Sequence, residues 1–204
     1  MLRVTHLIGF GASGAAGPVQ PVWNSADKDA DVTLSNVDLT MSMAGSTTGG
    51  VRTTFAVAAG KSYFEVRQDN AGSASRIGIA TGSYTLTVAP GNDANSWSVD
   101  GDGNIRNNSG TAIRDIGTMP ATTGGILMFA FDLGAGKLWI GNADANSWYE
   151  GGDPAAGTGE QFSGITGPIY LCAGRSGGSS TRGATLPLLA SYLRTPPAGF
   201  TAGL

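Results

Sequence analysis

The sequence has very little of the residues that most often carry catalysis or metal binding. Among its 204 residues there is one cysteine, Cys172, and one histidine, His6. A single cysteine excludes a disulfide within the chain. One cysteine and one histidine together supply almost no ligands for a transition metal. A serine nucleophile would also need a base beside it, and the lone histidine is in a Gly/Ala-rich N-terminal stretch. We therefore expect a protein that is not an enzyme and has no metal or cofactor.

Charge and long apolar runs are scarce as well. Charged residues make up 13% of the chain and the formal net charge is -3. There is no basic stripe of the kind that binds nucleic acid. No apolar run reaches the length of about 18 residues that suggests a membrane-spanning helix. The sequence predicts neither nucleic-acid binding nor membrane insertion.

Glycine and short apolar segments are abundant. The clearest feature is an apolar segment at 126–132 and another at 137–141, separated by the turn Leu133-Gly134-Ala135-Gly136. Two strand-like runs around a Gly-rich turn predict a β-hairpin, with Asp132 and Lys137 at its closed end. Alternation along the two hairpin strands, and along two earlier strands at 61–67 and 75–80, predicts which residues are in the core. They are Phe64, Val66, Ile77, Ile79, Phe129, Phe131, Leu138 and Ile140.

Weaker strand signals recur along most of the chain, and no segment has a convincing helical period. Further strands are predicted at 31–35, 37–43, 51–57, 61–67, 75–80, 84–88, 168–173 and 186–193, with loops at 148–164 and 174–183. Many short strands separated by turn signals are typical of a sandwich. We predict one all-β domain at 26–204, a two-sheet antiparallel β-sandwich, preceded by an N-terminal arm at 1–25.

The arm is predicted to dock on a partner. Leu7, Ile8 and Phe10 stand beside a Gly/Ala-rich run, and Pro18 and Pro21 follow. Such a segment has no core of its own, and exposed apolar residues next to it usually mark an interaction site. The expected partners are other proteins of the same assembly or copies of this chain. The alternative is a first edge strand at 2–8.

One short sequence occurs twice. Asp93-Ala94-Asn95-Ser96-Trp97 is repeated as Asp144-Ala145-Asn146-Ser147-Trp148, 51 residues later. Either both are turns whose tryptophans anchor on the core, or the two loops line one ligand surface. In the second case the ligand-binding residues are Asn95, Trp97, Asp100, Asn146, Trp148 and Tyr149, and the ligand is a glycan or a protein.

Four motifs resemble known sites and fail on context. Residues 9–14 fit G-x-G-x-x-G, but prolines follow where a helix should open. Residues 174–178 fit G-x-S-x-G without a base or a strand-to-helix elbow. Residues 100–104 begin like a calcium loop, but its twelfth position is Thr111, which excludes an EF-hand; an Asp-Gly turn explains them better than a looser oxygen site. The three glutamates, Glu65, Glu150 and Glu160, show no glycosidase pattern.

The order of the segments resembles the SPRY domain, a concanavalin-like jelly roll. Gly60-Lys61-Ser62-Tyr63-Phe64-Glu65-Val66 and Ile77-Gly78-Ile79-Ala80 are similar to two early strands of that family. The segment 96–105 is similar to the one in which a tryptophan precedes an Asp-Gly turn, and 129–141 matches its Asp-Leu-x-x-Gly-Lys-Leu-Trp-Phe hairpin. After the hairpin, Asn142-Ala143-Asp144 replaces the expected Lys-Asn-Gly turn. The resemblance extends over roughly 31–200.

Two further segments, 151–159 and 192–200, resemble bacteriophage and prophage versions of the domain. This resemblance implies a non-enzymatic virion protein, made in the bacterial cytoplasm and associated with a tail or fibre. Its sandwich would serve subunit docking and host-surface recognition. The alternatives are a capsid decoration protein or a stand-alone glycan-binding, lectin-like module.

Overall fold

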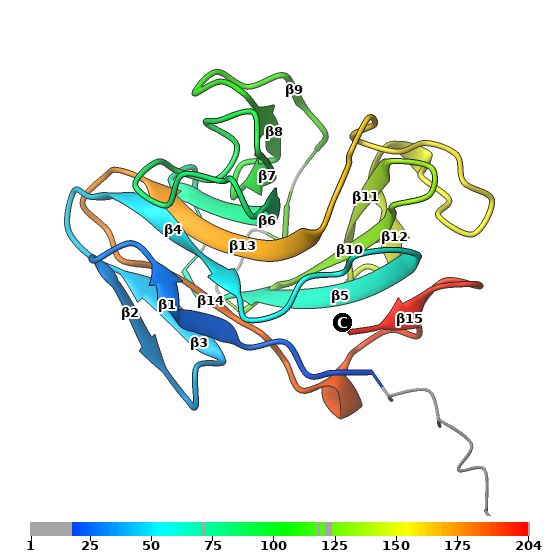
Figure 1. Ribbon diagram of the computed structural model, residues 1–204. Helices are drawn as coiled ribbons and strands as arrows, with labels where there is room; N and C mark the ends of the chain where they lie inside the picture. The colour runs from blue at the N-terminus through cyan, green and yellow to red at the C-terminus, as the bar shows by residue number, and fades with distance from the viewer. Residues whose placement is uncertain (1–17, 71, 118, 121–123, 204) are drawn as a thin grey trace, which may run out of the picture.

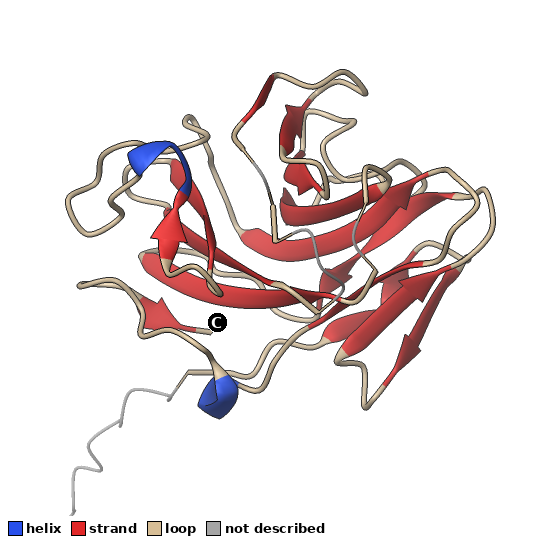
Figure 2. Cartoon of the chain, turned by 180° about the vertical axis from the view of Figure 1, so that it is seen from behind, coloured by secondary structure: helices blue, strands red, loops and turns tan. Residues whose placement is uncertain are grey.

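The computed structural model describes residues 18–70, 72–117, 119–120 and 124–203. Within them the chain forms two curved sheets packed face to face, as predicted, and nearly all regular structure is strand (Figures 1 and 2). Two 3₁₀ turns, η1 (Tyr149–Gly151) and η2 (Leu189–Ser191), are the helical elements of this part of the chain. No helix in the described ranges is long and apolar enough to cross a membrane.

The strands of each sheet follow an order that crosses the sequence repeatedly. The seven-stranded sheet has the order β1 (Trp23–Lys28), β4 (Thr48–Thr53), β13 (Ile169–Ser176), β6 (Ser75–Thr81), β7 (Ser96–Asp100), β8 (Asn104–Asn107) and β9 (Arg114–Asp115). The eight-stranded sheet has the order β12 (Ser147–Trp148), β11 (Lys137–Asn142), β10 (Ile126–Asp132), β5 (Lys61–Gln68), β14 (Arg182–Thr185), β3 (Thr40–Met43) and β2 (Val32–Ser35), with β15 (Thr201–Ala202) on β5. All pairs are antiparallel except β15 with β5.

The predicted hairpin and core are confirmed. β10 and β11 pair from Leu127 with Asn142 to Asp132 with Lys137, so those last two residues close the hairpin. All eight predicted core residues are buried in the cluster between the sheets. The rings of Phe64 and Phe131 stack there, with centroids 5.6 Å apart.

A second apolar cluster covers the outer face of the eight-stranded sheet. It contains Tyr63, Met128, Ala130, Trp139, Ala143 and Phe200. These side chains alternate along β5, β10 and β11 with those of the main core, so both faces of these central strands are buried. The chain after β14, residues 186–203, covers part of this face, and we call it the C-terminal strap. β15, at its end, pairs with β5 beyond the point where β14 stops.

Several strand predictions were wrong at the level of single elements. Residues 84–88 are a loop, because Tyr84 Oη donates to the Val88 carbonyl and the loop lies on the outer face of the seven-stranded sheet. Residues 186–193 form η2 and extended chain, so β15 is the last strand. The predicted strand 51–57 ends at Thr53, and the predicted loop 174–183 contains the end of β13 and the start of β14. β7 and β8 lie in a stretch for which no strand was predicted from periodicity, although 96–105 is among the segments that resemble the SPRY domain.

The N-terminal segment is described only from Pro18. β1 starts at Trp23, which is fully buried, so the strand includes the last three residues of the segment expected to be an arm. Leu7, Ile8 and Phe10 lie outside the described residues.

Candidate functional site

The two repeated loops do not form one surface. Trp97 is on β7 and packs into the core between the sheets, with 9% of its surface exposed. Trp148 is on β12 and packs against the cluster on the outer face of the other sheet, where its ring meets Tyr63 edge-on at 6.3 Å. Asn95 belongs to the β6–β7 turn, where its carbonyl accepts the amide of Thr81. The anchoring interpretation therefore describes Trp97 and also Trp148, which is half-buried.

Asp100 is a structural residue of the β7–β8 turn. Its side chain is 0% exposed and its oxygens accept the backbone amides of Asp102 and Asn104. Arg76 and Arg106 form ion pairs with it at 3.3 and 3.0 Å. With its lone pairs used inside the fold, this carboxylate is not free for a ligand. The Asp-Gly turn interpretation of 100–104 accounts for the geometry.

The remaining candidates lie together after β11. The turn that replaces Lys-Asn-Gly is closed by Asn146, whose amide donates to the Ala143 carbonyl and whose φ is 52°. Asp144 accepts the amide of Ile126 and so ties the turn to β10. Trp148 and Tyr149 follow, both half-buried. Burial raises the pKa of Tyr149 to about 12, so the phenol stays protonated at neutral pH.

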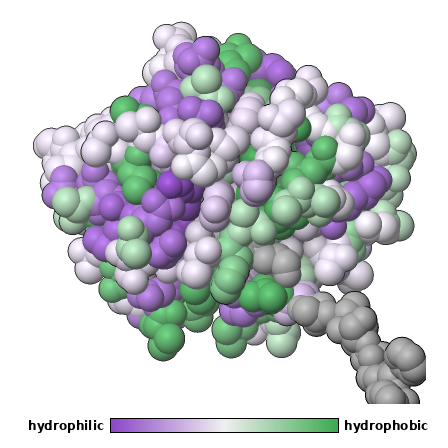
Figure 3. Space-filling view, in the orientation of Figure 1, coloured by the Kyte–Doolittle hydropathy of each residue, from purple (hydrophilic) through white to green (hydrophobic). Residues whose placement is uncertain are grey.

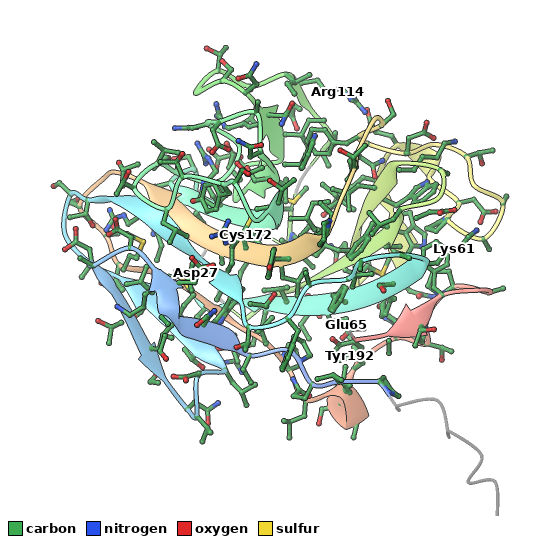
Figure 4. All side chains as sticks on the ribbon, viewed as in Figure 1. Asp27, Lys61, Glu65, Arg114, Cys172 and Tyr192 are labelled. Atoms are coloured by element: carbon green, nitrogen blue, oxygen red, sulfur yellow. The ribbon has the colours of Figure 1, made fainter. Side chains whose placement is uncertain are left out.

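An ion pair joins this loop to the opposite sheet, and we did not anticipate it. Arg114 on β9 donates to both carboxylate oxygens of Glu150 in η1, at 3.0 and 2.8 Å, and to the carbonyl of Gln161. The bond from Arg114 holds the pKa of Glu150 below its ordinary value. The two residues are 36 positions apart and neither belongs to a periodic pattern, so no sequence signal pointed to the pair. Figure 4 shows Arg114 beside β9 at the upper end of the sandwich.

Glu150 has a backbone conformation that is rare for its residue type. Its φ is 54°, in the left-handed region that glycine, asparagine and aspartate enter most readily. The bidentate ion pair and the hydrogen bonds around Gln161, whose side chain donates to the Tyr149 carbonyl, hold the strained turn in place. Strain of this kind persists where surrounding contacts impose it, and it is concentrated at functional sites.

We name the residues Ile113, Arg114, Asn146, Trp148, Tyr149 and Glu150 the β9–η1 surface. Within it Arg114 and Glu150 join the two sheets, Trp148 packs on the outer face of the eight-stranded sheet, and Tyr149 packs against the core between the sheets. It combines two half-buried aromatic rings, an exposed apolar side chain, an exposed amide and a bidentate ion pair. Such a surface can stack on an apolar face and hydrogen-bond to hydroxyl or amide groups.

The three glutamates that were weighed for glycosidase chemistry all have partners within the fold. Glu65 accepts two backbone amides and a tyrosine hydroxyl, Glu150 is bound to Arg114, and Glu160 is 3.2 Å from Lys137. No group of three histidine, cysteine or acidic side chains in the described part of the chain could hold a metal ion. Ser176 ends β13, and the single histidine lies outside the described residues.

Comparison with known proteins gives a clear result for the fold alone. No family profile and no curated protein matches the sequence. Among solved structures, the PSpry domain of TRIM65 is similar with a TM-score of 0.62 and 18% identity, over 84% of this chain and 93% of that domain. The SPRY domain of human HERC1 has a TM-score of 0.62 and 9% identity, over 82% and 98%. Stonustoxin has a TM-score of 0.57 and 17% identity, over 84% of this chain and 27% of the toxin.

At these identities the likeness concerns architecture. Two antiparallel sheets with the predicted hairpin and core, and structural neighbours of the SPRY type, lead to one conclusion: the chain has a SPRY-like β-sandwich fold.

Proposed function

We propose that this chain is a non-enzymatic bacteriophage virion protein of a tail or fibre, whose sandwich recognises a host-surface glycan through the β9–η1 surface. Support for the virion assignment is the resemblance of 151–159 and 192–200 to phage versions of the domain. Both segments contact Trp139 on the outer face of the eight-stranded sheet. The indole Nε1 of Trp139 donates to the Thr158 carbonyl, and its ring meets Phe200 edge-on at 6.2 Å.

The observation that carries the recognition proposal is the Arg114–Glu150 pair. It ties an edge of one sheet to the loop of the other and holds Glu150 in a strained conformation next to Trp148 and Tyr149. A surface fixed in this way loses little conformational freedom on binding, so more of its contact energy appears as affinity.

A glycan fits the chemistry of this surface. Sugar rings present apolar C–H faces that stack on aromatic rings, and their hydroxyls pair with amide, carboxylate and guanidinium groups. Asn146 is exposed, and the side chains of Arg114 and Glu150 are 41% and 36% exposed, so their outer atoms are open to a ligand.

The test is binding of the labelled full chain to an array of bacterial surface glycans. We expect a defined subset to bind and Arg114→Ala to weaken that binding by about tenfold, or about 1.4 kcal/mol. The matched control is Arg67→Ala, which removes another exposed ion pair, with Asp69, on β5. This control should bind like the unaltered chain. Absence of glycan binding, or equal loss in both variants, would contradict the proposed function.

A further inference from the structure

Exposed apolar side chains gather where the two ends of the described chain meet. The described residues include six large apolar side chains that are exposed, and three of them are Val19, Leu188 and Leu193, at 41%, 52% and 47%. Leu189, between them in sequence, is half-buried against Gly203. We call Val19, Leu188, Leu189 and Leu193 the terminal patch. Figure 3 shows a green area at the lower edge of the molecule, beside the grey N-terminal residues.

The terminal patch is built on a fixed support. Gln20 donates to the Pro187 carbonyl and accepts the amide of Leu189, which ties the N-terminal chain to η2. On the other side, the amide of Leu193 donates to the buried carboxylate of Glu65 at 2.7 Å. Figure 4 shows Glu65 and Tyr192 close together below β5. A rigid exposed apolar patch is a typical interaction site, since its binding does not first have to order it.

The residues that precede the patch have the matching chemistry. Residues 1–17 join the described chain at Pro18, directly before Val19, so they leave the domain at the patch itself. Residues 7–17 carry no charge, Arg3 is the one charged side chain of residues 2–10 when His6 is neutral, and the terminal patch consists of apolar side chains. Apart from Met1, residues 1–17 contain five large apolar residues, which are Leu2, Val4, Leu7, Ile8 and Phe10.

We propose that residues 2–10 of a second copy of this chain cover the terminal patch, so that copies associate by exchanging their N-terminal segments. This inference goes beyond the proposed function and names a partner for the N-terminal segment, which the sequence predicts to be a docking arm. The five large apolar residues of one segment carry more apolar surface than the three exposed side chains of one patch can bury. Exchange between copies lets the segments bury the remainder against each other. Exchange of an identical element is a low-cost route to association.

The first test is the mass of the full chain across a concentration series, by sedimentation velocity. We expect an oligomer whose population falls when Leu188→Ser and Leu193→Ser are combined, and equally when Leu7, Ile8 and Phe10 are changed to serine. The matched control is Phe55→Ser, which removes an exposed apolar side chain of similar exposure, 55%, in the β4–β5 loop. Thermal unfolding of each variant confirms that the sandwich is intact. A monomeric full chain, or an oligomer unaffected by the patch variant, overturns the proposal.

The second test identifies which copy supplies the segment. Phe10→Cys combined with Leu193→Cys introduces one thiol on each side, while Cys172 is buried and does not compete. Under mild oxidation we expect a disulfide between chains, seen as a dimer or larger species without reductant. A disulfide within one chain would show that the segment covers its own patch and would overturn the exchange, as would no cross-link. Neither outcome affects glycan binding, so a failure here is separate from a failure of the recognition proposal.

Discussion

The carboxylate of Glu65 is the point at which the C-terminal strap is held to the sandwich. Glu65 is 0% exposed and lies on the outer face of β5. Its two oxygens accept the backbone amides of Leu193 and Arg194, at 2.7 and 2.8 Å, and the hydroxyl of Tyr63 at 2.7 Å. Two consecutive amides aimed at one buried anion make strong, charge-assisted bonds. Removing the charge should therefore release the strap.

The magnitude follows from the donors that Glu65→Gln leaves without an acceptor. A glutamine keeps one carbonyl oxygen but directs an NH₂ group at atoms that are themselves donors. At least one buried backbone amide then loses its partner, at a cost of about 1–3 kcal/mol, and the remaining bonds lose their charge assistance. We expect the free energy of unfolding to fall by about 2–4 kcal/mol. Tyr63→Phe removes a single hydroxyl donor and should cost about 0.5–1.5 kcal/mol.

The assay should separate local release from global unfolding. Arg194 is held in the native state through the carbonyls of Ala143 and Asp144, so trypsin should cut after it slowly in the unaltered chain. In Glu65→Gln we expect faster cleavage at this site and faster hydrogen exchange of the strap amides, measured together with denaturant unfolding. Glu160→Gln, which alters a partly exposed pair with Lys137, is the control and should change little. Unchanged stability and unchanged protection of the strap in Glu65→Gln would refute this account.

Three further outcomes are expected. Phe131→Ala should lower the free energy of unfolding by about 3–5 kcal/mol in denaturant titration, because it removes a stacked, fully buried ring; Phe55→Ala, at an exposed position, should cost far less. Arg114→Ala should cost less than about 1 kcal/mol at neutral pH, since both partners are partly exposed. Arg114 lowers the pKa of Glu150, so the stability that this ion pair contributes is present above the ordinary value of 4.5 and is lost as pH falls through the folded-state pKa. The melting temperatures of the unaltered chain and of Arg114→Ala should therefore converge in acid. Burial raises the pKa of Cys172, and a thiol reagent should leave it unmodified in the native protein and react after unfolding; rapid native labelling would show that β13 is not buried as described.

The fold class and the central part of the core could be predicted from local sequence. The β10–β11 hairpin has alternating apolar residues and a Gly-rich turn, so its register depends on neighbours in the chain. The apolar residues Phe64 and Val66, two positions apart in β5, likewise predict which face of that strand packs in the core between the sheets. The short strands β7 and β8 were not predicted, because β7 offers only two alternating apolar residues, Trp97 and Val99, and β8 only one, Ile105, which pairs with Val99 across the strands.

The candidate surface and the docking surface needed the tertiary structure. Sequence reasoning found Trp148 and Tyr149, but it grouped them with Trp97 and Asp100, which the fold places in a different layer and buries. The Arg114–Glu150 pair joins elements of opposite sheets, and the hold of Glu65 on the strap joins positions 128 residues apart. Local alternation determines which residues a strand buries, because side chains point to opposite faces in turn. Which surfaces meet depends on the order in which distant strands pair, and no residue carries that order in its own sequence neighbourhood.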